Sequence, residues 1–159
     1  MINKCCIDSP IGPLTITAND QSVISIEFKG SDQRETSSPL IQLCIDELSA
    51  YFNGGLSEFT VPIELSGTPF QNKVWQALTE IPFGTSISYS ELAIKLGDLK
   101  CIRAAGTANG KNKIPIIIPC HRVIGKDGSL VGFSGGIDKK KWLLKHEGII
   151  RGEQIEIFA

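Results

Sequence analysis

The spacing of apolar residues changes along the chain and separates a strand-rich first part from a helical remainder. Short apolar stretches at 3–7, 14–17 and 23–28 are joined by Ser-Pro, Gly-Pro and Asn-Asp steps, which favour turns. They predict three short strands, and residues 59–65 are a candidate for another. From Gly67 onward the apolar positions follow a helical period.

A helix is also expected inside the first part, after a polar connection over residues 31–38. Ser38-Pro39 predicts its start, because Pro at the first helical position loses no hydrogen bond. Its apolar face would hold Ile41, Cys44, Ile45, Leu48 and Phe52. Asn53-Gly54-Gly55 would end it. Residues 1–66 therefore form a small α+β unit whose sequence carries no evident chemistry.

Two capping boxes, Thr68–Gln71 and Ser88–Glu91, predict the starts of helices in the second part. The first helix would bury Phe70, Val74, Ala77, Leu78 and Ile81 and stop before Pro82. The second would run through Leu92, Ala93 and Leu96 to Gly97. A third is expected over about 101–109, and a last one over 138–145. Apolar and polar residues alternate only weakly over the tail, residues 154–158, and this pattern is compatible with a strand or with disorder.

The two helices within residues 88–109 have the spacing of a helix-turn-helix. The second carries Ala104, Ala105, Gly106 and Ala108, small residues that let a backbone approach its target. An αα-hairpin packed on a core has the same pattern, so the pattern alone leaves both open. The charge favours DNA: residues 95–126 hold seven basic residues against Asp98 alone, whereas residues 1–66 hold nine acids against three bases. A solvated surface is the alternative interpretation of the charge.

Composition is that of a folded chain, with 42% hydrophobic and 21% charged residues among 159. No apolar run approaches the ~20 residues of a membrane helix, and Asp8 in a weakly apolar amino terminus argues against a secretion signal. We expect a cytoplasmic protein with no membrane partner. Five irregularly spaced cysteines predict neither a disulfide framework nor, with only His121 and His146, a metal site.

Cys120-His121 is the one candidate for nucleophilic chemistry. A thiolate is a strong nucleophile, an imidazole can take its proton, and a carboxylate can orient the imidazole. Most cysteines are small buried hydrophobes, however, and adjacent side chains do not normally face each other. The pair alone leaves both interpretations open. If it is a triad, we expect the chain to bend after Pro119 and Cys120 to titrate below ~8.5.

The segment Pro119–Val123 resembles the active-site signature of the methylated-DNA–protein-cysteine methyltransferase (O6-alkylguanine-DNA alkyltransferase) family, P-C-H-R-V. The resemblance covers most of the carboxyl half. The matching segments are Gly67–Gln71, Val74–Trp75, Ile81–Gly84, Ser88–Tyr89, Arg103–Gly106, Ala108–Gly110, Asn112, Ile118–Gly125, Gly132–Gly136, Lys141–Leu144 and Glu147–Gly148. Residues 1–66 resemble the family's leading domain only in length and strand order.

The resemblance implies an α+β fold in which residues 67–159 bind DNA and transfer the alkyl group. Cys120 would accept the alkyl group from O6-alkylguanine, and possible repair of O4-alkylthymine stays open. His121 would take the thiol proton through a water, and Glu147 would hold the imidazole. Tyr89 would serve the leaving guanine. Asn112 would brace the active-site segment.

For DNA, the resemblance implies a helix-turn-helix in the minor groove, with Arg103 filling the gap left by the extruded nucleotide. The other implied DNA contacts are Ala104, Ala105, Thr107, Asn109 and Gly110. The implied guanine pocket comprises Val123, Phe133, Ser134, Gly135 and Pro115.

Departures from the family pattern are few. Lys113 stands where Pro is frequent, and Phe133 stands where Tyr is frequent. The amino-terminal zinc ligands of some relatives and the cysteine-rich sensor domain of others are missing. The resemblance therefore implies a stand-alone repair protein, monomeric, without metal or cofactor, acting on duplex DNA that carries alkylated guanine.

Three other functions compete with alkyl transfer. Lesion-binding relatives that transfer nothing have Trp in place of the cysteine, whereas this chain has Cys120. A plain helix-turn-helix regulator would not need the combination of Cys120, His121, Tyr89 and Glu147. A cysteine hydrolase would turn over and would need an oxyanion hole, for which the sequence offers no candidate.

Overall fold

A computed structural model describes residues 1–31, 34–130, 133 and 135–150. The chain divides into two compact units. The first comprises Met1–Ser66 together with Lys113–Pro115, and the second comprises Gly67–Asn112 together with the chain from Ile116 onward. Within the described residues, no helix is long and apolar enough to cross a membrane.

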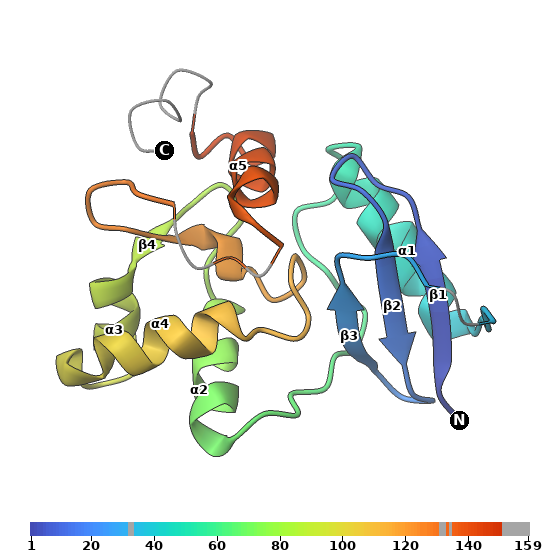
Figure 1. Cartoon of the computed structure of the whole chain (residues 1–159), viewed down its shortest axis with the longest axis horizontal. Helices are drawn as coiled ribbons and strands as arrows, with labels where there is room; N and C mark the ends of the chain where they lie inside the picture. The colour runs from blue at the N-terminus through green and yellow to red at the C-terminus, as the bar shows by residue number, and fades with distance from the viewer. Residues whose placement is uncertain (32–33, 131–132, 134, 151–159) are drawn as a thin grey trace. The chain divides into compact units, whose positions relative to one another are not determined.

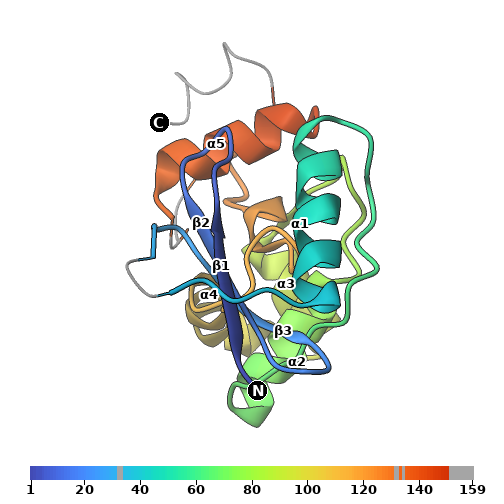
Figure 2. The same cartoon turned by 90° about the vertical axis from the view of Figure 1, so that its right-hand side faces the viewer.

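The first unit is an antiparallel sheet of three strands, β1 (Asn3–Ile7), β2 (Leu14–Ala18) and β3 (Val23–Glu27), in the order β1-β2-β3. Helix α1 (Pro39–Phe52) packs against it (Figures 1 and 2). The predicted strands and helix are confirmed. The shared core is formed by buried apolar side chains from both layers: Leu14, Ile16, Ile26, Ile41, Cys44, Leu48 and Tyr51. Ile45, expected on the same face, is only half-buried.

The predicted strand over residues 59–65 is wrong, and Glu47 supplies the physical reason. This buried carboxylate accepts hydrogen bonds from the backbone N–H groups of Thr60 at 2.9 Å and Val61 at 2.8 Å, and from the Thr60 hydroxyl at 2.7 Å. Because a side chain bonds these donors, they are not available to a strand ladder. Only an isolated parallel bridge between Val23 and Ile63 remains.

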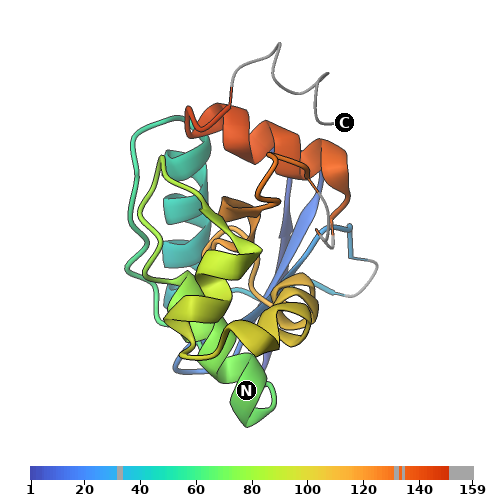
Figure 3. The same ribbon diagram turned by 90° about the vertical axis from the view of Figure 1, so that its left-hand side faces the viewer.

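The second unit is mainly helical, with α2 (Pro69–Leu78), α3 (Tyr89–Lys95), α4 (Ile102–Gly110) and α5 (Ile137–His146). Both predicted capping boxes are present. Helices α2 and α3 both pack against α4 (Figure 3). Trp75 on α2 is buried, and its indole N–H donates to the Ala108 carbonyl at 2.9 Å. Trp75 is thus the anchor of α2, whereas Phe70, predicted to be buried, is 36% exposed.

The helix-turn-helix differs from the prediction at its turn. A 3₁₀ turn, Leu99–Cys101, precedes α4, and the Asp98 side chain caps it by accepting from the Lys100 N–H at 2.9 Å. The second helix therefore begins at Ile102. The predicted last helix is confirmed as α5, and the predicted tail over residues 154–158 lies outside the described residues.

A short parallel pairing that the sequence did not predict connects the two halves of the second unit. Strand β4 (Ile87–Ser88) pairs with β5 (Val123–Ile124), with Ile87 opposite Val123. Two-residue strands are too short to show a period, which is why the pattern of apolar residues missed them. The pairing aligns the segment after Cys120 with the start of α3.

Candidate active site

Cys120 lies at a tight bend between two turns. Pro119 has φ −82° and ψ 64°, and the Cys120 N–H donates to the Ile118 carbonyl at 2.8 Å, which defines an inverse γ-turn. A 3₁₀ turn, Cys120–Arg122, follows directly, so the predicted bend after Pro119 is confirmed. Upstream, Ile116 is buried with φ 76°, a conformation that a β-branched residue adopts only under constraint.

Two buried asparagines hold this bend from α4 and the residues just after it. The Asn112 amide donates to the Ile118 carbonyl at 2.7 Å, and the Asn109 amide donates to the Cys120 carbonyl at 3.3 Å. Asn112 is therefore placed where the expected brace would act. Asn109, expected to contact DNA, is only 1% exposed, so its side chain belongs to the interior and that expectation is corrected.

His121 and Arg122 share the carboxylate of Glu147. Imidazole Nε2 lies 2.6 Å from Oε2, while the guanidinium donates from Nε to Oε1 at 2.7 Å and from Nη2 to Oε2 at 3.1 Å. The third guanidinium nitrogen, Nη1, donates to the Ile81 carbonyl at 2.6 Å. All of these side chains are buried. A carboxylate held by two guanidinium hydrogen bonds acts as an acceptor toward the imidazole, so Nε2 carries the hydrogen and Nδ1 keeps its lone pair.

The end of α5 determines where Glu147 points. Glu147 is the C-cap residue, and Gly148 follows with φ 76°. The Gly148 N–H donates to the Lys145 carbonyl and the Ile149 N–H donates to the Leu144 carbonyl, which is the hydrogen-bond pattern of a Schellman motif. The left-handed residue requires glycine, so Glu147-Gly148 couples the helix end to the buried carboxylate. The Gly84 N–H adds a hydrogen bond to Oε1 at 3.3 Å.

The surroundings of the thiol oppose its ionisation, in the opposite direction to the expected pKa below ~8.5. Burial raises the pKa of Cys120 to about 11, although a hydrogen bond from the Asn112 side chain and the charge of Lys140 both lower it. Burial likewise lowers the pKa of His121. Glu147 raises that pKa, and the cations Arg122 and Lys140 lower it. The site therefore pairs a neutral thiol with a neutral imidazole.

Lys140 is a site residue that sequence reasoning missed. Its side chain is fully buried on α5, and the ammonium donates to the Val123 carbonyl at 2.8 Å and lies 5.9 Å from the centre of the Tyr89 ring. Desolvation lowers the pKa of Lys140 to about 8, and the neighbouring Cys120 raises it. The sequence did indicate that Lys140 faces the interior. It precedes the buried Leu143 and Leu144 by three and four residues and so lies on their face of the helix.

Tyr89 begins α3, one residue after its cap Ser88. Its ring packs on α4 at Gly106, where an added Cβ would lie 3.5 Å from the ring. Burial raises the pKa of Tyr89, and the negative charge of an ionised Cys120 would raise it further. A protonated phenol is therefore held near the nucleophile. A Cβ at Gly106 would meet the ring at an ordinary van der Waals distance.

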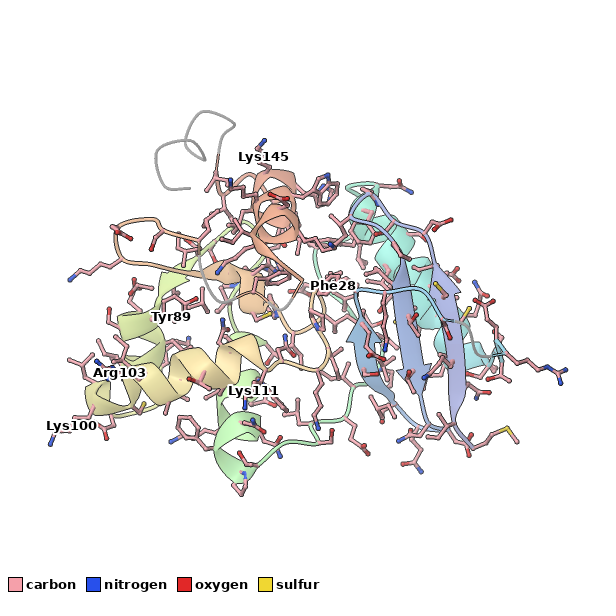
Figure 4. All side chains as sticks on the ribbon, viewed as in Figure 1. Phe28, Tyr89, Lys100, Arg103, Lys111 and Lys145 are labelled. Carbon is pink, nitrogen blue, oxygen red and sulfur yellow. The ribbon has the colours of Figure 1, made fainter. Side chains whose placement is uncertain are left out.

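The predicted DNA contacts divide between surface and interior. Arg103, Ala104 and Thr107 are exposed on α4, and Gly110 is half-buried, whereas Ala105 is fully buried and so cannot offer its side chain to DNA. Figure 4 shows the side chain of Arg103 at the start of α4 and that of Lys100 on the 3₁₀ turn just before it.

The predicted guanine pocket is only partly described. Val123 is buried, and Phe133 and Gly135 are half-buried. Ser134 lies outside the described residues, and Pro115 belongs to the first unit.

Comparison with known proteins agrees with this geometry. Residues 69–149 match the family described as "6-O-methylguanine DNA methyltransferase, DNA binding domain", and residues 3–65 match its "ribonuclease-like domain". The chain is 44% identical to the methylated-DNA–protein-cysteine methyltransferase of Mycobacterium tuberculosis, with 92% of this chain and 93% of the relative covered. It is 43% identical to the protein of that name from Methanosarcina barkeri, with 89% and 94% covered.

Solved structures give the same result. The O6-methylguanine methyltransferase of M. tuberculosis matches with a TM-score of 0.84 and 41% identity over the whole of both chains. The M. tuberculosis OGT in complex with DNA matches with a TM-score of 0.82 and 42% identity over 96% of this chain and 97% of that one. The α+β fold and the buried cysteine site are thus those of a DNA-repair methyltransferase. The chain belongs to the 6-O-methylguanine DNA methyltransferase family.

Proposed function

We propose that this chain repairs DNA by transferring the alkyl group of O6-alkylguanine to Sγ of Cys120, once per molecule. The observation that carries the proposal is the position of Cys120, buried at a tight bend and followed directly by a histidine that Glu147 holds at 2.6 Å. Family membership supplies the reaction class, and the described residues supply groups for each step.

The transfer is a displacement at the alkyl carbon. The bond from Sγ to carbon forms while the bond from carbon to guanine O6 breaks. The thiol proton passes to Nδ1 of His121 through a water, and Nε2–H stays bonded to Glu147. Among the described residues Nδ1 is buried and has no hydrogen-bond partner, so its lone pair is not used by another protein donor. The Tyr89 phenol donates its proton to the departing guanine and limits the charge on the purine. The proton taken up by His121 then returns to the phenolate through water, so the net change moves the thiol proton to guanine.

Because the pKa of Cys120 is raised, the thiol loses its proton during the reaction and not before it. A thiol with a pKa of about 11 is ionised in only a small fraction of molecules at pH 7. The thiolate therefore forms as His121 accepts the proton with substrate in place. A buried neutral thiol is also protected from adventitious oxidation and alkylation, which suits a protein that can react only once.

DNA binding is assigned to the helix-turn-helix. The exposed Arg103 and the lysines of residues 95–126 provide positive charge for phosphates. Arg103 occupies the space of the extruded nucleotide, because a backside attack on the alkyl carbon cannot occur inside the base stack. The substrate is duplex DNA with an alkylated guanine, bound by a single copy of the chain.

Mass spectrometry of the intact protein tests the proposal. Mixing with a duplex oligonucleotide that contains one O6-methylguanine should add the mass of a single methylene group, and peptide mapping should locate it on Cys120. Cys120→Ser should bind the duplex and gain no mass. Repeated turnover with excess lesion would contradict the proposal, as would alkylation of Cys44 or Cys101 in place of Cys120. Binding without any mass gain would instead indicate a lesion-binding protein.

A further inference from the structure

We infer that Asn109 is a positioning residue for alkyl transfer, acting through the Cys120 carbonyl to hold the nucleophile from the DNA-binding helix. The inference rests on the proposed function and goes beyond it, since the expected brace is Asn112 and Asn109 was expected to contact DNA. Asn109 lies on α4 and is 1% exposed, so its amide acts within the protein.

Two carbonyls at the reactive bend, those of Ile118 and Cys120, are held in the same way. The Ile118 carbonyl accepts one backbone hydrogen bond, from the Cys120 N–H, and one side-chain hydrogen bond, from Asn112. The Cys120 carbonyl accepts one backbone hydrogen bond, from the Val123 N–H, and one side-chain hydrogen bond, from Asn109. Together the two amides hold the Ile118–Pro119 peptide group, whose carbonyl bonds the Cys120 N–H, and the Cys120–His121 peptide group. This restrains the direction of the Cys120 Cα–Cβ bond.

The contact of Asn109 is the weaker of the two. Its length, 3.3 Å, exceeds the usual N–H···O length of ~2.9–3.0 Å. Its other atom, Oδ1, is buried and has no hydrogen-bond partner among the described residues. A single long hydrogen bond of this kind adds little to the stability of the fold. It is better explained by a requirement to hold the Cys120 carbonyl.

Alkylation occurs once per molecule, and this separates a positioning role from a structural one. A variant that is merely destabilised loses amplitude, because fewer molecules are folded, but each folded molecule reacts at the normal rate constant. A variant with a misplaced nucleophile reacts to full amplitude with a lower rate constant. Intact mass followed in time with excess lesion duplex measures both quantities in one experiment.

We expect Asn109→Leu to reach full amplitude with a rate constant lowered by about 10-fold to 100-fold, the size of effect expected from a displaced reacting group. Asn72→Leu is the matched control, since it removes a 2.8 Å hydrogen bond to the Gly67 N–H in the same unit without touching the active-site bend. It should keep the wild-type rate constant. DNA affinity should stay within about twofold of wild type in both variants, because the Asn109 side chain is buried and Asn72 is not among the implied DNA contacts.

Asn109→Asp provides a readout that a structural role would not produce. An ionised carboxylate cannot donate to the Cys120 carbonyl, but a protonated one can. The rate constant of Asn109→Asp relative to wild type should therefore recover as the pH falls, while the ratio for Asn109→Leu stays flat. A wild-type rate constant in Asn109→Leu, or pH-independent ratios for both variants, would overturn the inference. If wild-type protein gains no mass at all, the proposed function fails instead.

Discussion

The Arg122 guanidinium and the Glu147 carboxylate form a buried two-point ion pair, with Nε 2.7 Å from Oε1 and Nη2 3.1 Å from Oε2. The same Oε2 atom lies 2.6 Å from His121. Arg122 therefore prevents the carboxylate from rotating away from the imidazole. It also contributes positive charge that lowers the pKa of His121. Both effects keep His121 neutral, in one tautomer and in one orientation.

Arg122→Met should destabilise the fold strongly. Removing one partner leaves a buried carboxylate without its cation, which typically costs about 3–5 kcal/mol. Lys29→Ala is the matched control, because Lys29 pairs with Glu27 on the surface at 3.2 Å and such pairs contribute about 1 kcal/mol or less. Urea unfolding followed by tryptophan fluorescence measures both. Equal midpoints for the two variants would show that the buried pair contributes no more than the exposed one.

His121→Ala and Glu147→Gln should each slow alkyl transfer by orders of magnitude and leave DNA affinity nearly intact. Without the imidazole the thiol loses its base, and without the carboxylate the imidazole loses its orientation. The double variant should be little slower than the slower single variant, because groups that act as one unit are not additive. Rate constants from quenched mass spectrometry test this. Multiplicative effects in the double variant would mean that the two residues act independently.

The sequence predicted the elements whose cause is local. Thr68 and Ser88 begin helices because each forms a capping box with a residue three positions later, and Ser38-Pro39 begins α1 for a similarly local reason. The predicted strand at 59–65 failed because its N–H groups bond to Glu47, about thirteen residues away. Propensity and periodicity carry no information about such a distant partner.

In the candidate site, too, features that a local motif determines were predicted, and features that depend on distant packing or burial were not. The resemblance identified Cys120, His121 and Glu147, and their contacts are consistent with the roles it implied. It did not indicate that Asn109 points inward, which depends on how helices pack. It did not indicate the burial of Lys140 either, although the spacing of Lys140 from Leu143 and Leu144 places it on their face of the helix. The expected low pKa of Cys120 failed because the motif shows the base but not the burial of the thiol.

Lys140→Met should slow alkyl transfer about tenfold with little change in stability. The ammonium lowers the pKa of Cys120, so its loss makes the thiolate harder to form. Methionine has a similar volume, and removing a buried charge offsets the lost hydrogen bond to Val123, so the free energy of unfolding should change by about 1 kcal/mol or less. Lys139→Met is the control on the same helix. Transfer at the wild-type rate in Lys140→Met would exclude an electrostatic role.

Small thiol reagents should modify Cys120 slowly at neutral pH in DNA-free protein. Because burial raises the pKa of the thiol to about 11, the fraction of thiolate should increase about tenfold per pH unit through the range from 7 to 9.5. Iodoacetamide labelling of Cys120, quantified by peptide mapping, measures this profile, and Cys101, which is half-buried, is an internal comparison. A rate that levels off below pH 8.5 would show that the thiol is activated in the resting protein.

Arg103→Ala should impair repair in duplex DNA more than repair in single-stranded DNA. Arg103 is exposed on the first turn of α4, and its proposed role is to fill the stack that the damaged nucleotide vacates. A single strand has no complementary partner stack to fill, so the variant should react there at nearly the wild-type rate. Ile102→Ala, at an exposed position of α4 that is not among the implied DNA contacts, is the control for general damage to the helix surface.

Affinity for undamaged duplex, measured over a range of salt concentrations, separates extrusion from simple attraction to phosphates. Loss of one cation that contacts a phosphate should reduce the slope of log affinity against log salt by about one. If Arg103 acts on the vacated stack, Arg103→Ala should leave most of that slope in place while the repair rate in duplex falls. Equal slowing of repair in single-stranded and duplex DNA would show that Arg103 contributes to binding or to folding rather than to extrusion.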